Sequence, residues 1–241
     1  MYRRPRTAHP YRDTDVIDAR APRFNQATVG LVSLLAVISG WWPLLALLAL
    51  QLGVGLRFGR RYCLPCVTYF ELVQPRFGEG EIEDSRPPKF ANQIGLVVLG
   101  AASVAHLLGL APVGNGLGLL VAALALLAAT TGVCVGCEMY RIRARLQGIR
   151  EKVIDRVELA ELGEPLPKGS AGGLGELLVA FSHPLCTDCR TLIRDLAAGT
   201  APWVSVDVRE RPDLARKYGV ALVPTVIRVA ADGRVLHEAA G

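Results

Sequence analysis

Residues Arg60–Phe70 read RRYCLPCVTYF and follow directly on a long apolar stretch. The pattern returns at Cys134–Tyr140, which reads CVGCEMY, so both segments share the spacing C-x-x-C-x-x-Y. Two cysteines three positions apart suit disulfide exchange, metal binding or simple packing. The surrounding sequence has to decide between these roles.

Two long stretches of the chain carry no acidic or basic side chain. The chain has 241 residues, 51% of them hydrophobic, and neither 24–56 nor 90–137 contains Asp, Glu, Lys or Arg. A charge at the centre of a bilayer costs roughly 2.5–3.5 kcal/mol, so both stretches are membrane candidates. Each is longer than the roughly 20 residues that one helix needs, and each is interrupted by Gly and Pro. We therefore predict an α-helical membrane domain with four transmembrane helices, near 24–39, 44–58, 90–110 and 117–135.

Basic residues flank only one end of these helices. They occur in the N-terminal tail (1–23), between the second and third helices, and after the fourth, whereas the two hairpin tips have none. The excess of positive charge on cytoplasmic segments predicts a protein of the bacterial inner membrane with both termini and all its cysteines cytoplasmic. The net charge of +5 is explained by these flanks, and we expect no nucleic-acid partner.

A second motif, D-x-R-x-P-[RK]-F, introduces the first and third helices. It occurs at Asp18–Phe24 and again at Asp84–Phe90. Two motifs repeated in the same order predict a duplicated helical hairpin, with copies at 18–70 and 84–140. Because each copy holds an even number of helices, the copies have the same orientation and are related by a pseudo-twofold along the membrane normal. Both CxxC pairs then lie at the cytoplasmic face, where the axis can bring them together.

The chain changes character after the membrane domain (24–140). Apolar residues at helical spacing, followed by a Gly- and Pro-rich stretch, predict that 141–176 is an amphipathic helix and a linker with a reach of about 20 Å. An α/β pattern follows in 177–241. We expect strands at 177–182, 203–208, 225–229 and 234–238, and helices at 190–197 and 212–218.

A third CxxC pair, Cys186 and Cys189, lies between the first strand and the first helix of this region. The positive end of the helix dipole lowers the pKa of Cys186 and makes it the nucleophile. Cys189, one turn on, is the more buried thiol that resolves the mixed disulfide. The strand, the CxxC pair at a helix start and Val223-Pro224-Thr225 before a hairpin resemble the thioredoxin fold. The resemblance implies that Pro224 is cis and borders the surface that receives a substrate peptide.

The region departs from the thioredoxin pattern at several positions. Thr187-Asp188 stands between the cysteines instead of Gly-Pro, Leu185 replaces a common Trp, and Ala180 replaces the usual buried acid. These departures leave the redox potential and the choice of partner open. The last thioredoxin helix is missing after Gly241, so the membrane domain, a partner or a truncation would account for the uncovered sheet face.

The membrane domain also resembles a family. Its duplicated D-x-R-x-P-[RK]-F and C-x-x-C-x-x-Y motifs are similar to those of an uncharacterised family of small bacterial membrane proteins, catalogued as a domain of unknown function. The resemblance covers about residues 14–143. It implies no particular activity.

All six cysteines occur in CxxC pairs, and permanent structural disulfides are not expected on a cytoplasmic face. The leading hypothesis is an enzyme, a membrane thiol–disulfide oxidoreductase that exchanges electrons between the thioredoxin-like pair and the two membrane-edge pairs. Its predicted catalytic residues are Cys63, Cys66, Cys134, Cys137, Cys186, Cys189 and Pro224.

The neighbours of the membrane-edge cysteines favour reactivity. Arg60 and Arg61 are expected to stabilise a thiolate at Cys63. Pro65 suits the first turn of a short helix, which would place Cys63 at a helix N-terminus. Cys134 and Cys137 are expected one turn apart near the end of the fourth helix, a spacing that a disulfide can bridge.

Two alternatives remain open. The pseudo-twofold would allow Cys63, Cys66, Cys134 and Cys137 to form a Cys₄ site for zinc or an iron–sulfur cluster, maintained by the thioredoxin-like domain. A transporter of sulfur or thiols is the other. No cofactor is firmly implied, although quinone, zinc and an iron–sulfur cluster are compatible with the sequence. The expected partners are the lipid bilayer and protein thiols or disulfides, with a reductase or quinone as a further partner.

Overall fold

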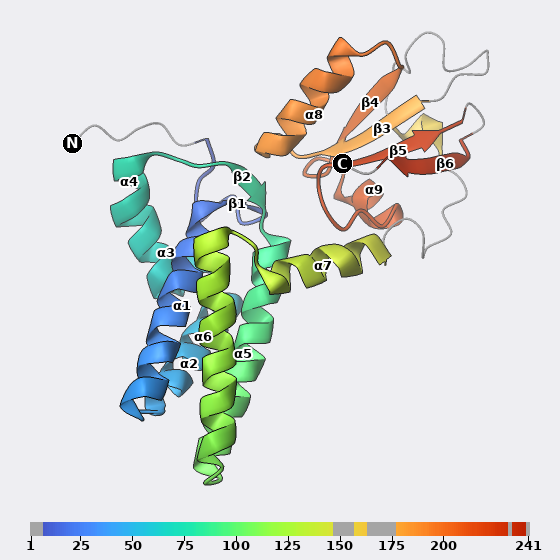
Figure 1. The fold of residues 1–241 in the computed structure, drawn as a ribbon. Helices are drawn as coiled ribbons and strands as arrows, with labels where there is room; N and C mark the ends of the chain where they lie inside the picture. Colours follow the sequence, from blue (N-terminus) through green and yellow to red (C-terminus); the bar gives the residue numbers. More distant parts are fainter. Residues whose placement is uncertain (1–6, 147–156, 163–176, 231–232, 240–241) are drawn as a thin grey trace. The chain divides into compact units, whose positions relative to one another are not determined.

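The computed structural model describes residues 7–146, 157–162, 177–230 and 233–239, and every structural statement below concerns these residues. The chain divides into two compact units, Met1–Tyr140 and Arg141–Gly241. Figure 1 shows helices dominating the first unit and a small sheet in the second. Each unit is described by itself.

Two helical hairpins form the first unit. Its long helices are α1 (Arg20–Ser39), α2 (Pro43–Phe58), α5 (Arg86–Leu107) and α6 (Ala111–Thr131). In Figure 1 they lie side by side, with the starts of α1 and α5 and the ends of α2 and α6 at the same end of the bundle. This end therefore carries both of the unit's CxxC pairs.

Three of these helices are long and apolar enough to cross a membrane, namely α1, α5 and α6. The helix α2 is apolar but has only 16 residues, fewer than the roughly 20 that span the hydrocarbon. Membrane association is thus supported, and length and composition alone support three of the four predicted spans. The predicted fourth span also shifts, because α6 ends at Thr131, where Gly132 adopts a left-handed conformation with φ of 80°.

The two hairpins are interlocked rather than juxtaposed. The helix α1 packs mainly on α6, and α2 packs mainly on α5. The first helix of each hairpin thus contacts the second helix of the other. The shared core includes Leu45 of the first hairpin and Leu99 and Ala102 of the second, all at most 1% exposed. Gly30 on α1 allows the close approach of Leu126 on α6, since a Cβ there would lie 2.7 Å from Leu126 Cγ.

A short antiparallel ribbon joins the two repeats. Strand β1 (Val16–Asp18) pairs with β2 (Ile82–Asp84), with Ile17 opposite Glu83 at its centre. Val16 lies opposite Asp84, and Asp18 lies opposite Ile82. Exchanging the two repeats leaves this register unchanged, so the pseudo-twofold passes through the Ile17–Glu83 pair. The ribbon therefore has the symmetry that the predicted duplication requires.

Each CxxC pair of the first unit lies at the beginning of a helical segment. The chain forms η1 (Arg60–Tyr62) just before Cys63, and from there α3 (Leu64–Thr68), which contains Cys66, the π-helix η2 (Tyr69–Val73) and α4 (Gln74–Phe77). At the second pair, α7 (Val135–Leu146) begins directly after Cys134 and contains Cys137. The predicted amphipathic helix is thus described as far as Leu146, whereas its continuation and most of the predicted linker lie outside the described residues.

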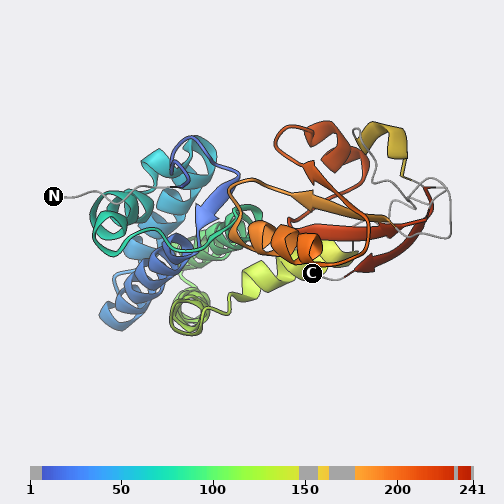
Figure 2. The same cartoon turned by 90° about the horizontal axis from the view of Figure 1, so that it is seen from above.

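The second unit is a four-stranded sheet with two flanking helices. Its elements are η3 (Leu159–Leu162), β3 (Leu177–Ser182), α8 (Thr187–Ala198), β4 (Trp203–Asp207), α9 (Pro212–Lys217), β5 (Thr225–Val229) and β6 (Val235–Ala239). The strand order is β4-β3-β5-β6, with β3 parallel to β4 and antiparallel to β5, and β6 antiparallel to β5. Figures 1 and 2 show α8 and α9 on opposite faces of this sheet.

The sheet unit includes a segment that the sequence assigned to the amphipathic helix and linker. Val157 is 2% exposed and belongs to the same apolar core as β3 and β5. Its backbone N–H donates to the carbonyl of Gly233 at 2.7 Å. Glu161 accepts a hydrogen bond from Lys217 on α9 at 2.7 Å. Residues 157–162 thus pack on the sheet although they precede it by more than a dozen positions.

Candidate functional site

All three CxxC pairs adopt the same local geometry. The first cysteine of each pair directly precedes a helix, which is α3 for Cys63, α7 for Cys134 and α8 for Cys186. Its sulfur accepts the backbone N–H of the second cysteine, at 3.4 Å for Cys66, 3.3 Å for Cys137 and 3.2 Å for Cys189. A sulfur held at a helix N-terminus is stabilised as a thiolate by the N–H groups and the positive end of the dipole.

The first membrane-domain pair is oxidised. Cys63 and Cys66 form a disulfide, with their Cα atoms 5.2 Å apart. Cys63 is buried, whereas Cys66 is partly exposed. Pro65 lies in the first turn of α3, as predicted, and leaves Cys63 at the N-cap.

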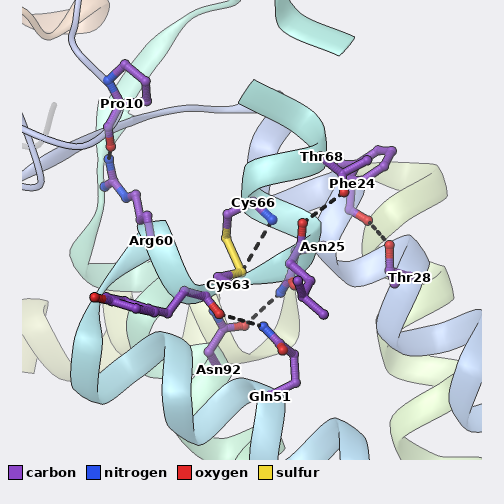
Figure 3. The surroundings of a disulfide bond; sticks show 12 residues. Pro10, Phe24, Asn25, Thr28, Gln51, Arg60, Cys63, Cys66, Thr68 and Asn92 are labelled. Atoms are coloured by element: carbon purple, nitrogen blue, oxygen red, sulfur yellow. Dashed lines mark hydrogen bonds between the residues drawn. A yellow bond between two sulfur atoms is a disulfide. The ribbon is translucent and has the colours of Figure 1, made fainter. Parts of the chain in front are cut away.

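The side chain of Arg60, which the sequence assigned together with Arg61 to stabilising a Cys63 thiolate, is engaged by other groups. Figure 3 shows the Arg60 guanidinium directed toward Pro10 and away from the disulfide. It donates to the backbone carbonyls of Pro10, Asp13, Thr14 and Val16, at 3.2, 3.2, 3.1 and 2.6 Å. Burial lowers the pKa of Arg60 to about 10. The arginine therefore fixes the N-terminal segment against the membrane unit.

Two amide side chains lie beside the disulfide. Asn25 of α1 donates through Nδ2 to Oδ1 of Asn92 of α5, at 3.2 Å. Figure 3 places this amide pair next to Cys63. Asn25 is only 5% exposed, so its amide group depends on the partner from the other repeat.

The second membrane-domain pair, Cys134 and Cys137, has free thiols and is partly exposed. The sequence predicted that Cys134 lies near the end of the fourth helix. In the structure Gly132 ends α6, and Cys134 lies in the loop before the new helix that begins at Val135. The pKa of Cys134 is lowered to about 6, first by a hydrogen bond from the Cys137 side chain and also by backbone N–H groups and the Gln26 side chain, against the opposing effect of burial. Cys134 is therefore largely a thiolate at neutral pH.

The loop that carries Cys134 is held by the beginnings of α1 and α5. A Cβ on Gly132 would lie 2.8 Å from the Arg23 guanidinium, and one on Gly136 would lie 2.8 Å from Cβ of Ala91. These close approaches show that the loop and the first turn of α7 pack tightly on both repeats.

The two repeated motifs contact one another. The ring of Phe24 lies 5.9 Å from that of Tyr69, and the ring of Phe90 lies 5.6 Å from that of Tyr140. In each repeat the phenylalanine of D-x-R-x-P-[RK]-F thus packs on the tyrosine of C-x-x-C-x-x-Y. This contact explains why the two motifs occur together, since one anchors the helix that follows the cysteines to the beginning of the hairpin.

The motif aspartates anchor the same end of the bundle. Asp18 is 2% exposed and accepts the hydroxyl of Tyr69, the amide of Gln74 and the N–H of Gly80, each at 3.0 Å. It also accepts the N–H of Arg20 at 2.9 Å. Burial, together with the charge of Asp18, raises the pKa of Tyr69. Asp18 therefore anchors the start of α1 to η2, α4 and the segment before β2.

The third pair lies in the core of the sheet unit. Cys186 is 2% exposed and Cys189 is fully buried. The hydrogen bond with Cys189 lowers the pKa of Cys186, although burial opposes it, whereas the same bond and burial raise the pKa of Cys189. Cys186 is thus the more acidic thiol, as predicted. The Val223–Pro224 peptide bond is cis, also as predicted.

The structure does not bring the membrane-domain pairs together as metal ligands. Among the described residues, no three or more His, Cys, Asp or Glu side chains are close enough to hold a metal ion. The Cys₄ arrangement of Cys63, Cys66, Cys134 and Cys137 is therefore absent from this part of the chain.

A family described as a domain of unknown function, DUF4395, matches residues 17–145. The chain belongs to this family. The predicted resemblance of the membrane domain is thereby confirmed, and the DUF4395 match includes part of β1, all of β2, the long helices and both membrane-domain CxxC pairs. None of the curated proteins matches the chain.

Sequence reasoning missed three polar residues in the DUF4395 domain. Asn25 and Asn92 lie beside the disulfide, and the Gln26 side chain contributes to the lowered pKa of Cys134. A signal was present, because the second residue after the motif phenylalanine is an amide in both repeats, Gln26 and Asn92. Comparing the repeats two positions further would have revealed it.

Proposed function

We propose that this protein is a membrane thiol–disulfide oxidoreductase, in which Cys186 and Cys189 exchange disulfides with the two CxxC pairs of the DUF4395 domain. The observation that carries the proposal is the geometry shared by all three pairs. In each, a backbone N–H of the second cysteine reaches the sulfur of the first at the start of a helix. A packing role would not require the same polar contact three times.

The proposal treats the sheet unit as thioredoxin-like. Its support is the order strand β3, CxxC pair, helix α8, parallel strand β4 and then the antiparallel β5–β6 hairpin. The cis Pro224 directly before β5 is a second support. In this reading Pro224 borders the surface that receives the partner, and Cys186 is the nucleophile.

Exchange with the first membrane-domain pair follows ordinary thiol–disulfide chemistry. The Cys186 thiolate attacks the sulfur of Cys66, which is more exposed than Cys63, and the S–S bond of the disulfide breaks. Cys63 leaves as a thiolate at the start of α3, where the N–H of Cys66 stabilises it. Cys189 then loses its proton and attacks Cys186, which releases Cys66.

This sequence of steps balances without another reactant. The Cys186/Cys189 dithiol is oxidised, the Cys63–Cys66 disulfide is reduced, and two electrons and two protons change place. The same steps run in reverse when the membrane-domain dithiol is the donor. The partners outside the chain, whether protein thiols, a reductase or a quinone, decide the direction.

We also propose that α2 is a fourth membrane span, which places both termini and all cysteines in the cytoplasm. A helix of 16 residues is about 24 Å long, some 6 Å short of a typical hydrocarbon core. Local thinning and snorkelling flanks accommodate such a mismatch at modest cost. Trp41 and Trp42 precede α2, and Arg57 lies in its last turn, so both ends carry interfacial residues.

Metal analysis of protein purified without oxygen tests the redox role against the Cys₄ alternative. We expect substoichiometric zinc and iron, together with two additional alkylatable cysteines after reduction, from the Cys63–Cys66 pair. One zinc or one iron–sulfur cluster per chain that is lost on both Cys63→Ser and Cys134→Ser would overturn the proposal. The sulfur-transport alternative has no observation in its favour and stays a prediction from the sequence.

A further inference from the structure

Reduction of the first membrane-domain pair leaves a negative charge on a buried sulfur. Cys63 is the leaving group of the proposed exchange, and its side chain is buried, so water has little access to its thiolate. Gly55 of α2 closes one side, since a Cβ there would lie 3.2 Å from Cβ of Cys63. A buried charge needs hydrogen-bond donors from the protein. The donors around Cys63 therefore influence how readily the disulfide is reduced.

The nearby cation does not supply such a donor. Arg60 donates to four backbone carbonyls, and Figure 3 shows its guanidinium directed away from the disulfide. The backbone N–H of Cys66 reaches the Cys63 sulfur at 3.4 Å. Anionic groups in proteins are stabilised most when they accept several hydrogen bonds, so one N–H leaves room for a further donor.

The Asn25–Asn92 pair lies where this donor is needed. Figure 3 places both amides beside Cys63. An amide nitrogen carries two N–H groups, and the bond from Nδ2 of Asn25 to Oδ1 of Asn92, at 3.2 Å, uses only one of them. Asn25 is buried, so its second N–H lies among protein groups rather than in bulk water. The Cys63 thiolate is an acceptor for this group.

We propose that Asn25 donates its second N–H to the Cys63 thiolate formed on reduction, and that Asn92 is a positioning residue that holds the Asn25 amide for this contact. Because Asn92 accepts one N–H of Asn25, it fixes the orientation of that amide. Without this acceptor the amide could turn and present its oxygen, which a thiolate repels. The two residues come from α1 and α5, so the contact joins the two repeats at the disulfide.

This inference deepens the proposed function and rests on it for its use. When the Cys186 thiolate attacks Cys66, the S–S bond breaks and its electron pair stays on Cys63. The Cys186/Cys189 dithiol is oxidised and the Cys63–Cys66 disulfide is reduced. Asn25 transfers no atom in this step and lowers the energy of the thiolate that leaves.

The test measures the acidity of Cys63 alone. The full-length Cys66→Ser protein in detergent, kept reduced with a phosphine, retains the backbone N–H at position 66 and has no second thiol beside Cys63. The rate at which iodoacetamide alkylates Cys63 is followed by peptide mass spectrometry as a function of pH. We expect a midpoint below the roughly 8.5 of an ordinary cysteine.

The decisive variants of this Cys66→Ser parent change the two amides. Asn25→Leu keeps the side-chain size but cannot donate, so the Cys63 midpoint should rise by about one pH unit, which is about tenfold in the thiolate equilibrium. Asn92→Leu removes only the positioning contact and should raise the midpoint by less. The double variant should shift it no further than Asn25→Leu alone, because the two residues act as one unit.

The matched control is Thr28→Val, one turn further along α1. The Thr28 hydroxyl donates to the carbonyl of Phe24 in its own helix, at 3.0 Å, so this substitution should leave the Cys63 midpoint as in the parent. Cys134 in the same molecules is an internal control and should keep its midpoint in every variant.

Three outcomes would overturn the inference. They are an Asn25→Leu variant with the parent's Cys63 midpoint, an Asn92→Leu variant with no shift, and an equal shift in Thr28→Val or at Cys134, which would indicate a general change in packing. Asn92 is partly exposed, so Asn92→Leu decides the question if Asn25→Leu does not fold. Alkylation needs no exchange within the chain, so failure of the proposed function is seen separately, as the absence of mixed disulfides with Cys186.

Discussion

The acidity of Cys134 and Cys186 comes mainly from hydrogen bonds with the second cysteine of each pair and with backbone N–H groups. Arg60 was the obvious candidate for stabilising a thiolate, yet its guanidinium is occupied by four backbone carbonyls. At Cys134 the stabilising groups are hydrogen-bond donors from Cys137, the backbone and Gln26. Hydrogen bonds to a charged acceptor contribute more than those between neutral groups, so a few donors suffice.

The pH dependence of Cys134 alkylation tests this origin. With a pKa of about 6, Cys134 should be mainly thiolate at pH 7, and its alkylation rate should fall to half at about pH 6 and further as the pH drops. Removing the largest stabilising group, in Cys137→Ala, should move the midpoint upward by at least about one pH unit. Alkylation rates of the peptide that contains Cys134, measured from pH 4 to about 9, give this midpoint.

Cys189→Ala is the control, because it lies in the other compact unit and should leave the Cys134 midpoint in place. A midpoint that stays near 6 in Cys137→Ala would contradict the assigned cause.

Asp18 is the residue on which the stability of the cysteine-bearing end depends most directly. Its carboxylate accepts four hydrogen bonds, from Arg20, Tyr69, Gln74 and Gly80. Asp18→Asn removes the negative charge and puts an amide N–H group beside hydrogen-bond donors that need an acceptor. The substitution should therefore lower the free energy of unfolding by about 2–4 kcal/mol. Thermal unfolding in detergent, followed by circular dichroism, provides the measurement.

The exposed Glu81→Gln should change stability by less than about 0.5 kcal/mol, and equal effects of the two substitutions would refute the anchoring role.

Residue-level prediction from the sequence succeeded where a motif carries the chemistry. The acidic thiol of Cys186, the cis bond at Pro224 and the helix that begins after Cys63 were all predicted and are confirmed. The partners of Arg60 and the amide contacts of Gln26 and Asn92 were not, because they depend on how the two repeats interlock. Spacing along one chain does not reveal which side chains of the other repeat lie nearby.

At the scale of elements, helices and strands were predicted well wherever a change in pattern marks an end. Strand β5 matches its predicted range, and β3 does as well. The break between α6 and α7 was missed because the charge-free stretch continues through Gly132, so hydropathy masked a glycine stop signal. The contribution of residues 157–162 to the sheet unit was missed since their contacts are distant in sequence.

The close packing of α7 on α5 is testable by adding one methyl group at their contact. A Cβ on Gly136 would lie 2.8 Å from Cβ and 2.9 Å from Cα of Ala91, so Gly136→Ala should displace the first turn of α7. Overpacking of this kind should lower stability by about 1–3 kcal/mol and shift the alkylation midpoint of Cys134. The comparison is Gly100→Ala on α5, where a Cβ meets nothing within 4 Å. If both substitutions leave the stability and the Cys134 midpoint as in the wild type, the close packing of α7 on α5 is refuted.

At the scale of the whole molecule, the duplicated hairpin places both membrane-domain CxxC pairs at one end of the bundle. The sequence predicted the duplication, and the self-symmetric register of β1 and β2 agrees with it. It could not predict that each hairpin packs its first helix on the other's second, because apolar helices of similar composition allow several pairings.

Labelling of intact cells tests the proposed orientation. An impermeant maleimide should leave the native cysteines unlabelled until the inner membrane is opened. A cysteine introduced at the exposed hairpin tip, in Leu110→Cys, should be labelled from outside. Labelling of Cys134 in intact cells, with Leu110→Cys protected, would show that the orientation is the reverse of the one proposed.

The central claim is that the sheet unit exchanges disulfides with the DUF4395 domain, and a trapped mixed disulfide measures it most directly. In Cys189→Ser the resolving thiol is missing, so attack by Cys186 should stop at a mixed disulfide. Non-reducing digestion and mass spectrometry should identify a peptide pair that joins Cys186 to Cys66, Cys63, Cys134 or Cys137, lost with reductant and absent from Cys186→Ser/Cys189→Ser. A Cys186 that remains alkylatable and forms no such bond, in protein whose Cys63–Cys66 disulfide is intact, would contradict the account.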